Sequence, residues 1–221
     1  MQKFFSNVRF FSPYSSLRGF TLVEAIVSIA IILLIGGSMI AFYRSVIMNT
    51  KVLQSSLNAQ QQIRRVQQAF IAELRSATQS AGGAYTIESA GTSSIAFFSN
   101  TDADASIEHV RYFFATSTKG GPYNVLKKGV IKPTGTVYDP TLEKISTVVF
   151  DVKNSSTTPI FTYYDSTYNG TSSTTPLAEP INVPAIRLVK MSLAVDPNAG
   201  RSPVYQTYTT QVSIRNLKDN F

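Results

Sequence analysis

The longest apolar stretch of the chain runs from Phe20 to Tyr43. It is interrupted by four clearly polar residues: Thr21, Glu24, Ser28 and Ser38. As a helix, residues 20–43 would span about 36 Å, which exceeds the roughly 30 Å of a bilayer's hydrocarbon core. The pattern therefore predicts a membrane-spanning helix. It also places an ionisable side chain inside that helix, which is costly and is by default a functional hypothesis.

A second helical pattern follows directly, since residues 44–79 contain no proline or glycine and are rich in good helix formers. Apolar residues recur there at mostly helical spacing: Val46, Leu53, Leu57, Ile63, Val66, Phe70, Leu74 and Ala77. The run Ala81-Gly82-Gly83 predicts the end of the helix. We therefore expect one continuous helix from Phe20 to Gln79, whose second part, residues 44–80, is an amphipathic stem packed on a head.

The head, residues 81–221, changes to short alternating segments separated by Gly, Pro, Asn, Asp and Ser clusters. Eight strands are expected: Tyr85–Ser89, Ser94–Ser99, Ile107–Ala115, Tyr123–Lys127, Lys144–Val152, Ile160–Asp165, Ala185–Asp196 and Gln206–Asn216. The last two are expected to pair as an antiparallel hairpin, and residues 153–184 read as a Ser/Thr-rich loop region. The fold class predicted is α+β, with the long helix packed on an antiparallel sheet.

The charge pattern gives the membrane helix a direction. Lys3, Arg9 and Arg18 precede it without any acid, and the next acid after Glu24 is Glu73. The positive-inside bias places the N-terminus in the cytoplasm and the head outside. On membrane physics alone this is an uncleaved signal anchor, with Glu24 in the first helical turn, where the helix dipole favours an acid.

Composition adds three limits. The formal charge of the 221-residue chain is +7, but 17 basic and 13 acidic residues remain after residue 19, a charge of +4. The basic balance is therefore partly a property of the leader and is weak support for nucleic-acid binding. A charged fraction of 15% with many hydroxyl side chains is typical of an exported surface, and the absence of cysteine excludes a disulfide framework.

The stretch Gly19-Phe20-Thr21-Leu22-Val23-Glu24, after a basic leader and before an apolar helix, resembles the N-terminus of type IV prepilins and type II secretion pseudopilins. The resemblance implies cleavage of the leader, residues 1–19, after Gly19 by a prepilin peptidase and N-methylation of Phe20. It implies that Glu24 supports methylation and attracts the terminal amine of a neighbouring subunit. Physics agrees, because a carboxylate in a low dielectric is far less costly when paired with a cation.

The chain departs from the family pattern at two places. The leader, 1–19, is longer than most leaders in the family, and position 41 is alanine where family helices often carry a proline. The pair Gly36-Gly37 could soften the helix instead, since glycine costs about 1 kcal/mol in a helix interior. The alternative is that these two glycines allow close helix packing in the membrane.

The order of leader, long helix, many-stranded head and terminal strand is similar to the larger minor pilins, meaning J-type pseudopilins and W-type minor pilins. The resemblance rests in the head on "HVRYFF", "ISTVVFDV" and the ending "VKMSLAV…YQTYTTQVSIRN". It implies other pilin subunits, the prepilin peptidase/methyltransferase, the inner-membrane assembly platform and the lipid bilayer as partners. It implies location in the bacterial cytoplasmic membrane and then in a pilus or pseudopilus, with the head outside.

No enzymatic chemistry is expected. Asn100, Asp102 and Asp104 space oxygen atoms as a calcium loop does, but Ala105 replaces the loop's glycine and a polar turn is the better interpretation. His109 is the single histidine and is expected to face solvent or stack on the sheet. No P-loop, dinucleotide fingerprint or hydrolase elbow is visible, so no catalytic residue, metal or cofactor is predicted. Asn154 and Asn169 match the N-x-Ser/Thr acceptor pattern, which is weak support for glycosylation.

Three functions remain open at this stage. The first is a structural subunit that assembles into, or primes the tip of, a type IV pilus or secretion pseudopilus. The second is a DNA- or surface-binding tip subunit of a competence or adhesion pilus, which eleven tyrosines and a mildly basic chain allow but no cluster supports. The third is an uncleaved signal-anchored surface protein.

Overall fold

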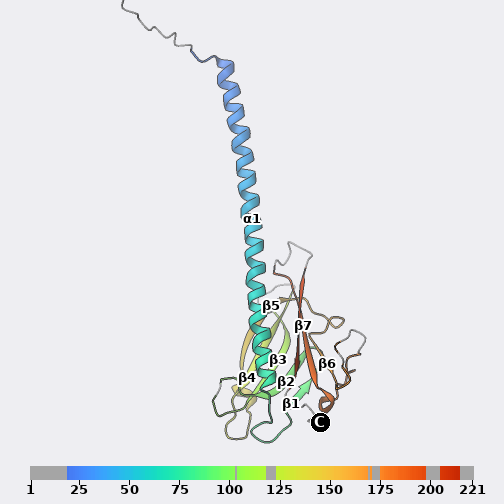
Figure 1. Cartoon of the computed structure of the whole chain (residues 1–221). Helices are drawn as coiled ribbons and strands as arrows, with labels where there is room; N and C mark the ends of the chain where they lie inside the picture. The colour runs from blue at the N-terminus through green and yellow to red at the C-terminus, as the bar shows by residue number, and fades with distance from the viewer. Residues whose placement is uncertain are drawn as a thin grey trace, which may run out of the picture. The chain divides into compact units, whose positions relative to one another are not determined.

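The structure is a computed structural model, and it describes residues 19–102, 104–117, 123–168, 170, 175–197 and 205–214. The chain divides into two compact units, residues 1–50 and 51–221. The regular structure of the described residues consists of eight strands, one long α-helix and two short 3-10 helices, η1 (Pro140–Leu142) and η2 (Val183–Ala185) (Figure 1). The predicted α+β class is confirmed: a long N-terminal helix packs on an eight-stranded antiparallel sheet.

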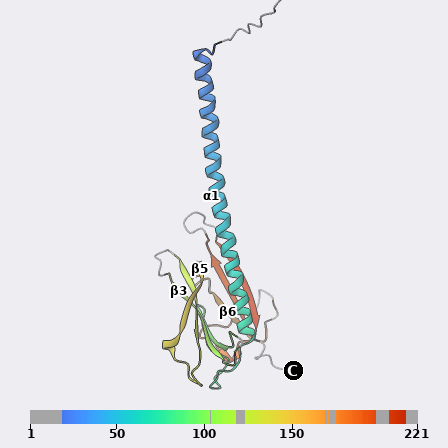
Figure 2. The ribbon, with the colours of Figure 1, turned by 90° about the vertical axis from the view of Figure 1, so that its left-hand side faces the viewer.

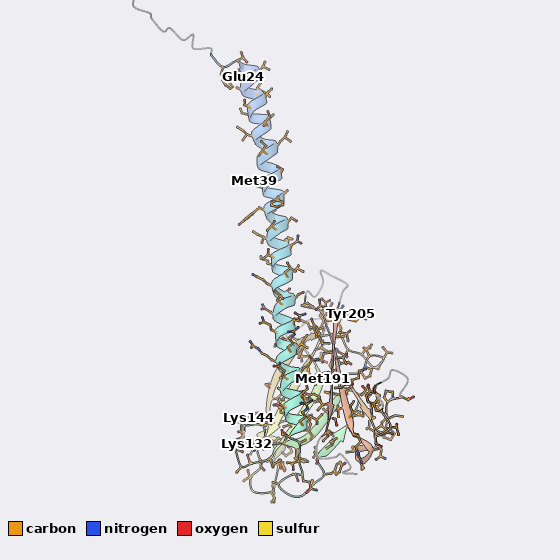
Figure 3. All side chains as sticks on the ribbon, viewed as in Figure 1. Glu24, Met39, Lys132, Lys144, Met191 and Tyr205 are labelled. Carbon is orange, nitrogen blue, oxygen red and sulfur yellow. The ribbon has the colours of Figure 1, made fainter. Side chains whose placement is uncertain are left out.

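Helix α1, Leu22–Arg75, starts two residues later than expected, because Thr21 caps it. Within the first unit its large apolar side chains point in all directions, and most of them are 44–77% exposed (Figure 3). A helix that is apolar all round suits a lipid environment rather than water. By length and composition this is the one helix among the described residues that could cross a membrane, with a mean hydropathy of 2.6 over its best window.

The second unit begins with residues 51–75 of α1, which carry the stripe that packs on the sheet. Ile63, Val66, Phe70 and Leu74 are 0–8% exposed, at the spacing that the sequence predicted. Three residues expected on the same stripe are exposed instead: Val46, Leu53 and Leu57, at 44%, 64% and 56%. Full burial along this stripe therefore begins at Ile63.

The helix also ends earlier than predicted, at Arg75 rather than Gln79. The reason is that the chain joins the sheet: Ala77 forms an isolated bridge with Ser99, and the Thr78 amide donates to the carbonyl of Phe98. An amide that bonds to a strand cannot donate to the preceding helical turn. Gly83, at φ 81°, then closes the turn that leads into the first strand.

All eight predicted strands exist, with small shifts at their ends. They are β1 (Ile87–Ala90), β2 (Ser94–Ser99), β3 (Glu108–Thr116), β4 (Asn124–Ile131), β5 (Lys144–Val152), β6 (Phe161–Tyr164), β7 (Leu188–Val195) and β8 (Gln206–Ser213). The order is β1-β2-β3-β4-β5-β7-β6, every pair is antiparallel, and β8 pairs the remaining edge of β7. The predicted β7–β8 hairpin is confirmed from Leu188↔Ser213 to Val195↔Gln206. Figure 2 shows that the sheet is curled rather than flat.

Four aromatic rings form the centre of the core between helix and sheet. Phe70 of α1 lies 5.3 Å from Tyr112, 5.8 Å from Phe161 and 6.3 Å from Phe97, measured between ring centroids. All four are at most 1% exposed. Edge-on and tilted contacts of this kind stabilise beyond the burial of area alone. Phe70 thus joins β2, β3 and β6 to the helix.

Strand β4 was expected to end at Lys127 and continues to Ile131. Lys127-Lys128-Gly129 gave no strand signal in the sequence, because glycine and paired lysines are poor strand formers. Eight-residue pairing with β3 carries the strand through them. Lys128 is accommodated because its ammonium reaches a carboxylate on α1, Glu73, at 2.5 Å.

Strand β5 carries two register shifts against β4. The second falls near Asp151, the one non-glycine residue with positive φ (57°) among the residues described. The Asp151 carbonyl accepts the amide of Asp196, a residue 1% exposed. This bond holds two acidic residues next to each other. Burial and then the Asp196 charge raise the pKa of Asp151 above its usual range.

Replacing Asp151 with asparagine is expected to stabilise the protein at neutral pH. A raised folded-state pKa means that the folded chain loses stability as pH rises from the unfolded value, about 3.9, through the folded one. Asparagine tolerates the left-handed conformation and carries no charge. We expect the melting temperature to rise by about 1–2 °C at pH 7, because solvent screens this partly exposed group. Thermal scans at pH 3 should show no gain, and an equal gain at both pH values would contradict the charge explanation.

Candidate functional site

The candidate site is the N-terminal motif, residues Gly19 to Glu24, at the start of α1. Gly19, Phe20 and Thr21 precede the helix, and Leu22, Val23 and Glu24 form its first turn. The Thr21 hydroxyl accepts the Glu24 amide at 3.3 Å, and the Thr21 carbonyl accepts the Ala25 amide at 3.1 Å. Threonine three residues before glutamate is the start signal of a helix, since both residue types satisfy the free amides there.

The Glu24 carboxylate is exposed and has no hydrogen-bond or ion-pair partner among the described residues (Figure 3). The positive end of the helix dipole lies at this turn and favours the charged form by less than about 1 kcal/mol. Within a bilayer that is small against the cost of an unpaired charge, about 2.5–3.5 kcal/mol at the helix centre. The first turn of α1 therefore carries a carboxylate that none of the described residues neutralises.

Two serines further along this apolar helix have hydrogen-bond partners within the helix itself. Ser28 donates to the carbonyl of Glu24 at 2.7 Å, and Ser38 donates to the carbonyl of Ile35 at 2.8 Å. Such back-bonds let hydroxyls lie in lipid without an outside partner. Glu24 is thus the polar side chain of this segment that still needs a partner.

The glycine pair in this helix does not interrupt it. Gly36 and Gly37 both lie inside α1, and a methyl group built on either would meet no atom within 4 Å. The two glycines therefore leave a flat, open stretch of helix surface, which another helix can approach closely. Both sequence interpretations, a soft point and a packing surface, remain compatible with a straight helix in a single chain.

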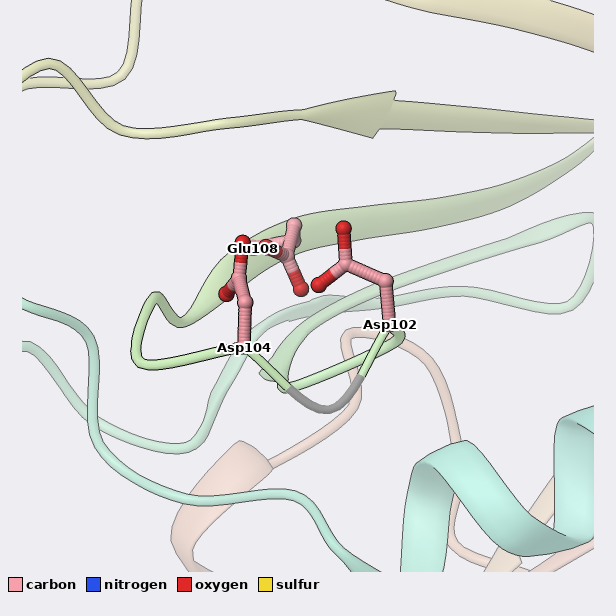
Figure 4. A group of neighbouring side chains, drawn as sticks. All are labelled: Asp102, Asp104 and Glu108. Atoms are coloured by element: carbon pink, nitrogen blue, oxygen red, sulfur yellow. The ribbon is translucent and has the colours of Figure 1, made fainter.

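The acidic loop before β3 is ion-paired within the protein. One carboxylate oxygen from each of Asp102, Asp104 and Glu108 lies within 4.8 Å of the others (Figure 4). Lys132 bonds both Asp102 and Asp104, the latter at 2.9 Å. Hydrogen bonds from Ser106 and then from Lys132 hold the pKa of Asp104 well below its usual range. The lysine ammonium thus brings one positive charge to three carboxylates and pairs with both aspartates of this turn.

Glu108 differs from the two aspartates because it is fully buried. Its carboxylate accepts the Thr101 amide at 2.8 Å and the Ser106 hydroxyl at 2.7 Å. Charge-assisted bonds to a loop amide are among the stronger hydrogen bonds. Glu108 therefore ties the β2–β3 loop down and is a structural residue.

His109 was expected either to face solvent or to stack on the sheet, and in the structure it stacks on the sheet. It is 8% exposed, and its ring lies 5.3 Å from that of Phe98 and 6.2 Å from that of Tyr138. Its Nε2 is 2.7 Å from a carboxylate oxygen of Glu88. A lone histidine with one acid and two aromatic neighbours forms no nucleophile–base pair, since no nucleophile is within reach among these residues.

Asn154 is a structural amide and not an exposed acceptor. It is 7% exposed, its Nδ2 donates to the carbonyls of Thr158 and Ser192 at 2.9 Å each, and its Oδ1 accepts the Ala194 amide at 2.8 Å. Attaching a glycan to Nδ2 would break these bonds. The weak glycosylation hypothesis is therefore wrong for Asn154, and Asn169 lies outside the described residues.

A largely buried polar cluster that was not predicted from the sequence lies between α1 and the sheet. Glu73 accepts the Lys128 ammonium at 2.5 Å and the Tyr112 hydroxyl at 2.9 Å. Burial, and then the Glu73 charge, raise the pKa of Tyr112 well above its usual range, so the phenol stays protonated and donates. A signal was present, because Glu73 is three residues after Phe70 and four before Ala77, on the apolar stripe itself.

The sequence also missed a groove of about 530 Å³ on the outer face of the C-terminal strands, which we call the outer-face groove. It lies away from the aromatic core, along β6, β7 and the start of β8. Its lining is Lys153, Asn154, Ser155, Thr157, Thr158, Pro159, Thr162, Tyr164, Lys190, Ser192, Ala194, Tyr205 and Thr207. The strands bring these side chains together from three distant parts of the sequence.

Known proteins offer no guide to either site. Comparisons of the chain with protein-family models, curated proteins and solved structures found no match. The structure itself therefore supplies the two candidate sites. One is the unpartnered carboxylate in the first turn of a helix that could cross a membrane. The other is the groove on the outer face of the β-sheet unit, which is lined mainly by polar residues.

Proposed function

We propose that the protein is a minor pilin or pseudopilin: a structural subunit processed after Gly19 and built into a type IV pilus or type II secretion pseudopilus, or into its tip. The observation that carries the proposal is the motif Gly19–Glu24 at the start of an apolar helix, with Glu24 unpartnered there. Cleavage would free an amine on Phe20, and the same end of each subunit would then carry both an amine and a carboxylate.

Assembly follows from this pairing. A head-to-tail contact in which one subunit's amine neutralises the next subunit's carboxylate repeats without closing, and so generates a filament. The pairing removes an uncompensated charge from the bilayer, which favours the assembled state over the separate subunits. The other expected partners, a prepilin peptidase/methyltransferase and an inner-membrane platform, act before and during that step. The role is structural and calls for no catalytic residue.

An uncleaved signal anchor is the second candidate, because the Thr21 cap gives both Thr21 and Glu24 a structural role without any assembly. The two candidates differ in covalent structure. Under the anchor hypothesis residues 1–19 stay attached, and Glu24 is an interfacial acid.

The N-terminus of the membrane-extracted protein decides between them. We expect a chain that begins at Phe20 with one added methyl group, measured by intact mass and by the mass of the terminal peptide. Cells without a prepilin peptidase are the matched control and should yield the full-length chain. A chain that retains residues 1–19 in cells with the peptidase would reject the pilin proposal.

A further inference from the structure

We propose that the outer-face groove binds a short acidic saccharide, with Lys190 holding a carboxylate of the sugar and Tyr205 packing against a ring face. The inference goes beyond the proposed assembly function and does not rest on it, because residues 153–207 form the groove. Its volume of about 530 Å³ falls in the roughly 300–1,000 Å³ range of small-ligand sites.

The charge of the groove favours an anion. Among the described residues two lysines line it and no acid does. Lys153 is already engaged: its ammonium lies 3.2 Å from Asp196 and 4.8 Å from the centre of the Tyr123 ring. Lys190 is half-buried in the middle of β7, and none of the described residues pairs with it. Its neighbours across the sheet, Thr162 and Gln211, are uncharged. A partly desolvated cation without an anionic partner is a favourable binding position for a ligand carboxylate.

The other lining groups favour a sugar as the carrier of that anion. Thr162, Ser192 and Thr207 present hydroxyls on the outer face, and each can both donate and accept a hydrogen bond, as a sugar hydroxyl does. Tyr205 is 52% exposed at the rim, and the Lys153 ammonium lies 5.9 Å from its ring centre, so the ring face away from Lys153 can meet the C–H face of a pyranose. Figure 3 labels Tyr205 among the side chains of this unit.

The groove is also held in shape before any ligand arrives. Asn154 joins the loop after β5 to β7 by bonds to Thr158, Ser192 and Ala194. Tyr164, at the other end, stacks against Tyr168 with 4.4 Å between ring centroids. A site whose walls are fixed by packing and hydrogen bonds loses less entropy on binding.

Single-stranded nucleic acid fits the groove less well. Binding of that kind needs several cations along the backbone and successive exposed rings for stacking. Here Lys153 is neutralised by Asp196, which leaves Lys190 as the one uncompensated cation of the lining. Tyr164 is 7% exposed and covered by Tyr168, which leaves Tyr205 as the exposed ring of the lining.

The test is a titration of the full-length protein in polyoxyethylene detergent, which has no sugar or charged headgroup. The probes are trigalacturonate and the neutral trisaccharide maltotriose, followed by calorimetry and by saturation-transfer NMR. We expect trigalacturonate to bind with a dissociation constant of about 1 mM or tighter, and maltotriose at least about tenfold more weakly. Lys190→Gln should weaken trigalacturonate binding about tenfold or more, since it removes one charge-assisted bond.

Lys144→Gln is the matched control, because Lys144 is an exposed lysine at the start of β5, outside the groove lining. It should bind as the wild type does, and both variants should keep the wild-type urea midpoint. Three results would overturn the proposal: no binding of trigalacturonate to the folded protein, equal binding of the two sugars, or an unchanged affinity in Lys190→Gln. Tighter, Lys190-dependent binding of oligothymidylate than of trigalacturonate would assign the groove to nucleic acid instead.

Discussion

Glu73→Gln is expected to lower the free energy of unfolding of the β-sheet unit by about 3 kcal/mol, because it leaves the Lys128 ammonium buried without a counter-charge. The Glu73 and Lys128 side chains are 11% and 16% exposed, so water cannot replace the lost carboxylate. The variant also weakens the bond from the Tyr112 hydroxyl. Glutamine has the shape of glutamate and is a good helix former, so packing and helix propensity change little.

Urea unfolding of the detergent-solubilised protein, followed by tyrosine fluorescence, measures the effect. A loss of this size should lower the midpoint by about 1 M or more. Lys132→Gln is the control, because it breaks two solvent-exposed ion pairs and should leave the midpoint nearly unchanged. The double variant Glu73→Gln, Lys128→Gln should be more stable than the sum of the single losses predicts, since no charge is left unpaired. Additive losses would mean that the pair is not coupled.

Glu24→Gln is expected to reduce incorporation of the protein into filaments at least about tenfold, without reducing its insertion into the membrane. The expectation rests on the proposed function. Removing the carboxylate removes its attraction for a neighbouring amine. In a bilayer this attraction is worth about 2.5–3.5 kcal/mol if it offsets the cost of an unpaired charge. Because glutamine is neutral, the variant is also easier to place in lipid than the wild type.

The measurement is the ratio of protein in sheared filaments to protein in the membrane fraction. Ser28→Ala is the matched control: it removes a polar group one turn further into the same helix, and that hydroxyl bonds within the helix. It should assemble as the wild type does. Wild-type incorporation of Glu24→Gln would show that the carboxylate has no role in assembly.

The two variants act on different parts of the molecule, and their effects should separate. Glu73 and Lys128 belong to residues 51–221, whereas Glu24 belongs to residues 1–50. Glu24→Gln should therefore leave the urea midpoint unchanged. A fall in that midpoint would point to misfolding as the reason for lost assembly.

Most of the sheet was predictable because strand positions depend on local pattern. In β7, Val189, Met191 and Leu193 alternate with Lys190 and Ser192, and the three apolar residues are fully buried. β4 was predicted too short for a reason that no local pattern contains: the pairing with β3 and the carboxylate on α1 that neutralises Lys128. The same holds for the end of α1, where a hydrogen bond to β2 replaces the next helical turn.

The candidate sites divide in the same way. The motif Gly19–Glu24 is a run of consecutive residues, so it could be read directly, and so could the cap that Thr21 provides. The outer-face groove could not, because Lys153, Lys190 and Tyr205 are brought together by strand pairing alone. The calcium-like spacing of Asp102 and Asp104 was visible in the sequence. Their ion pairs with Lys132, which lies 28 residues beyond Asp104, were not.

By itself the sequence determined what depends on neighbours along the chain: the apolar helix, its cap, the place of Glu24 in its first turn, and the alternation of eight strands. Those features follow from hydrogen bonds and burial over a few residues. Only the tertiary structure decided what depends on distant residues: the buried Glu73–Lys128–Tyr112 cluster, the early end of α1, the structural role of Asn154 and the groove around Lys190. Contacts of this kind arise once the sheet has brought separate segments within a few ångströms, and no local pattern encodes them.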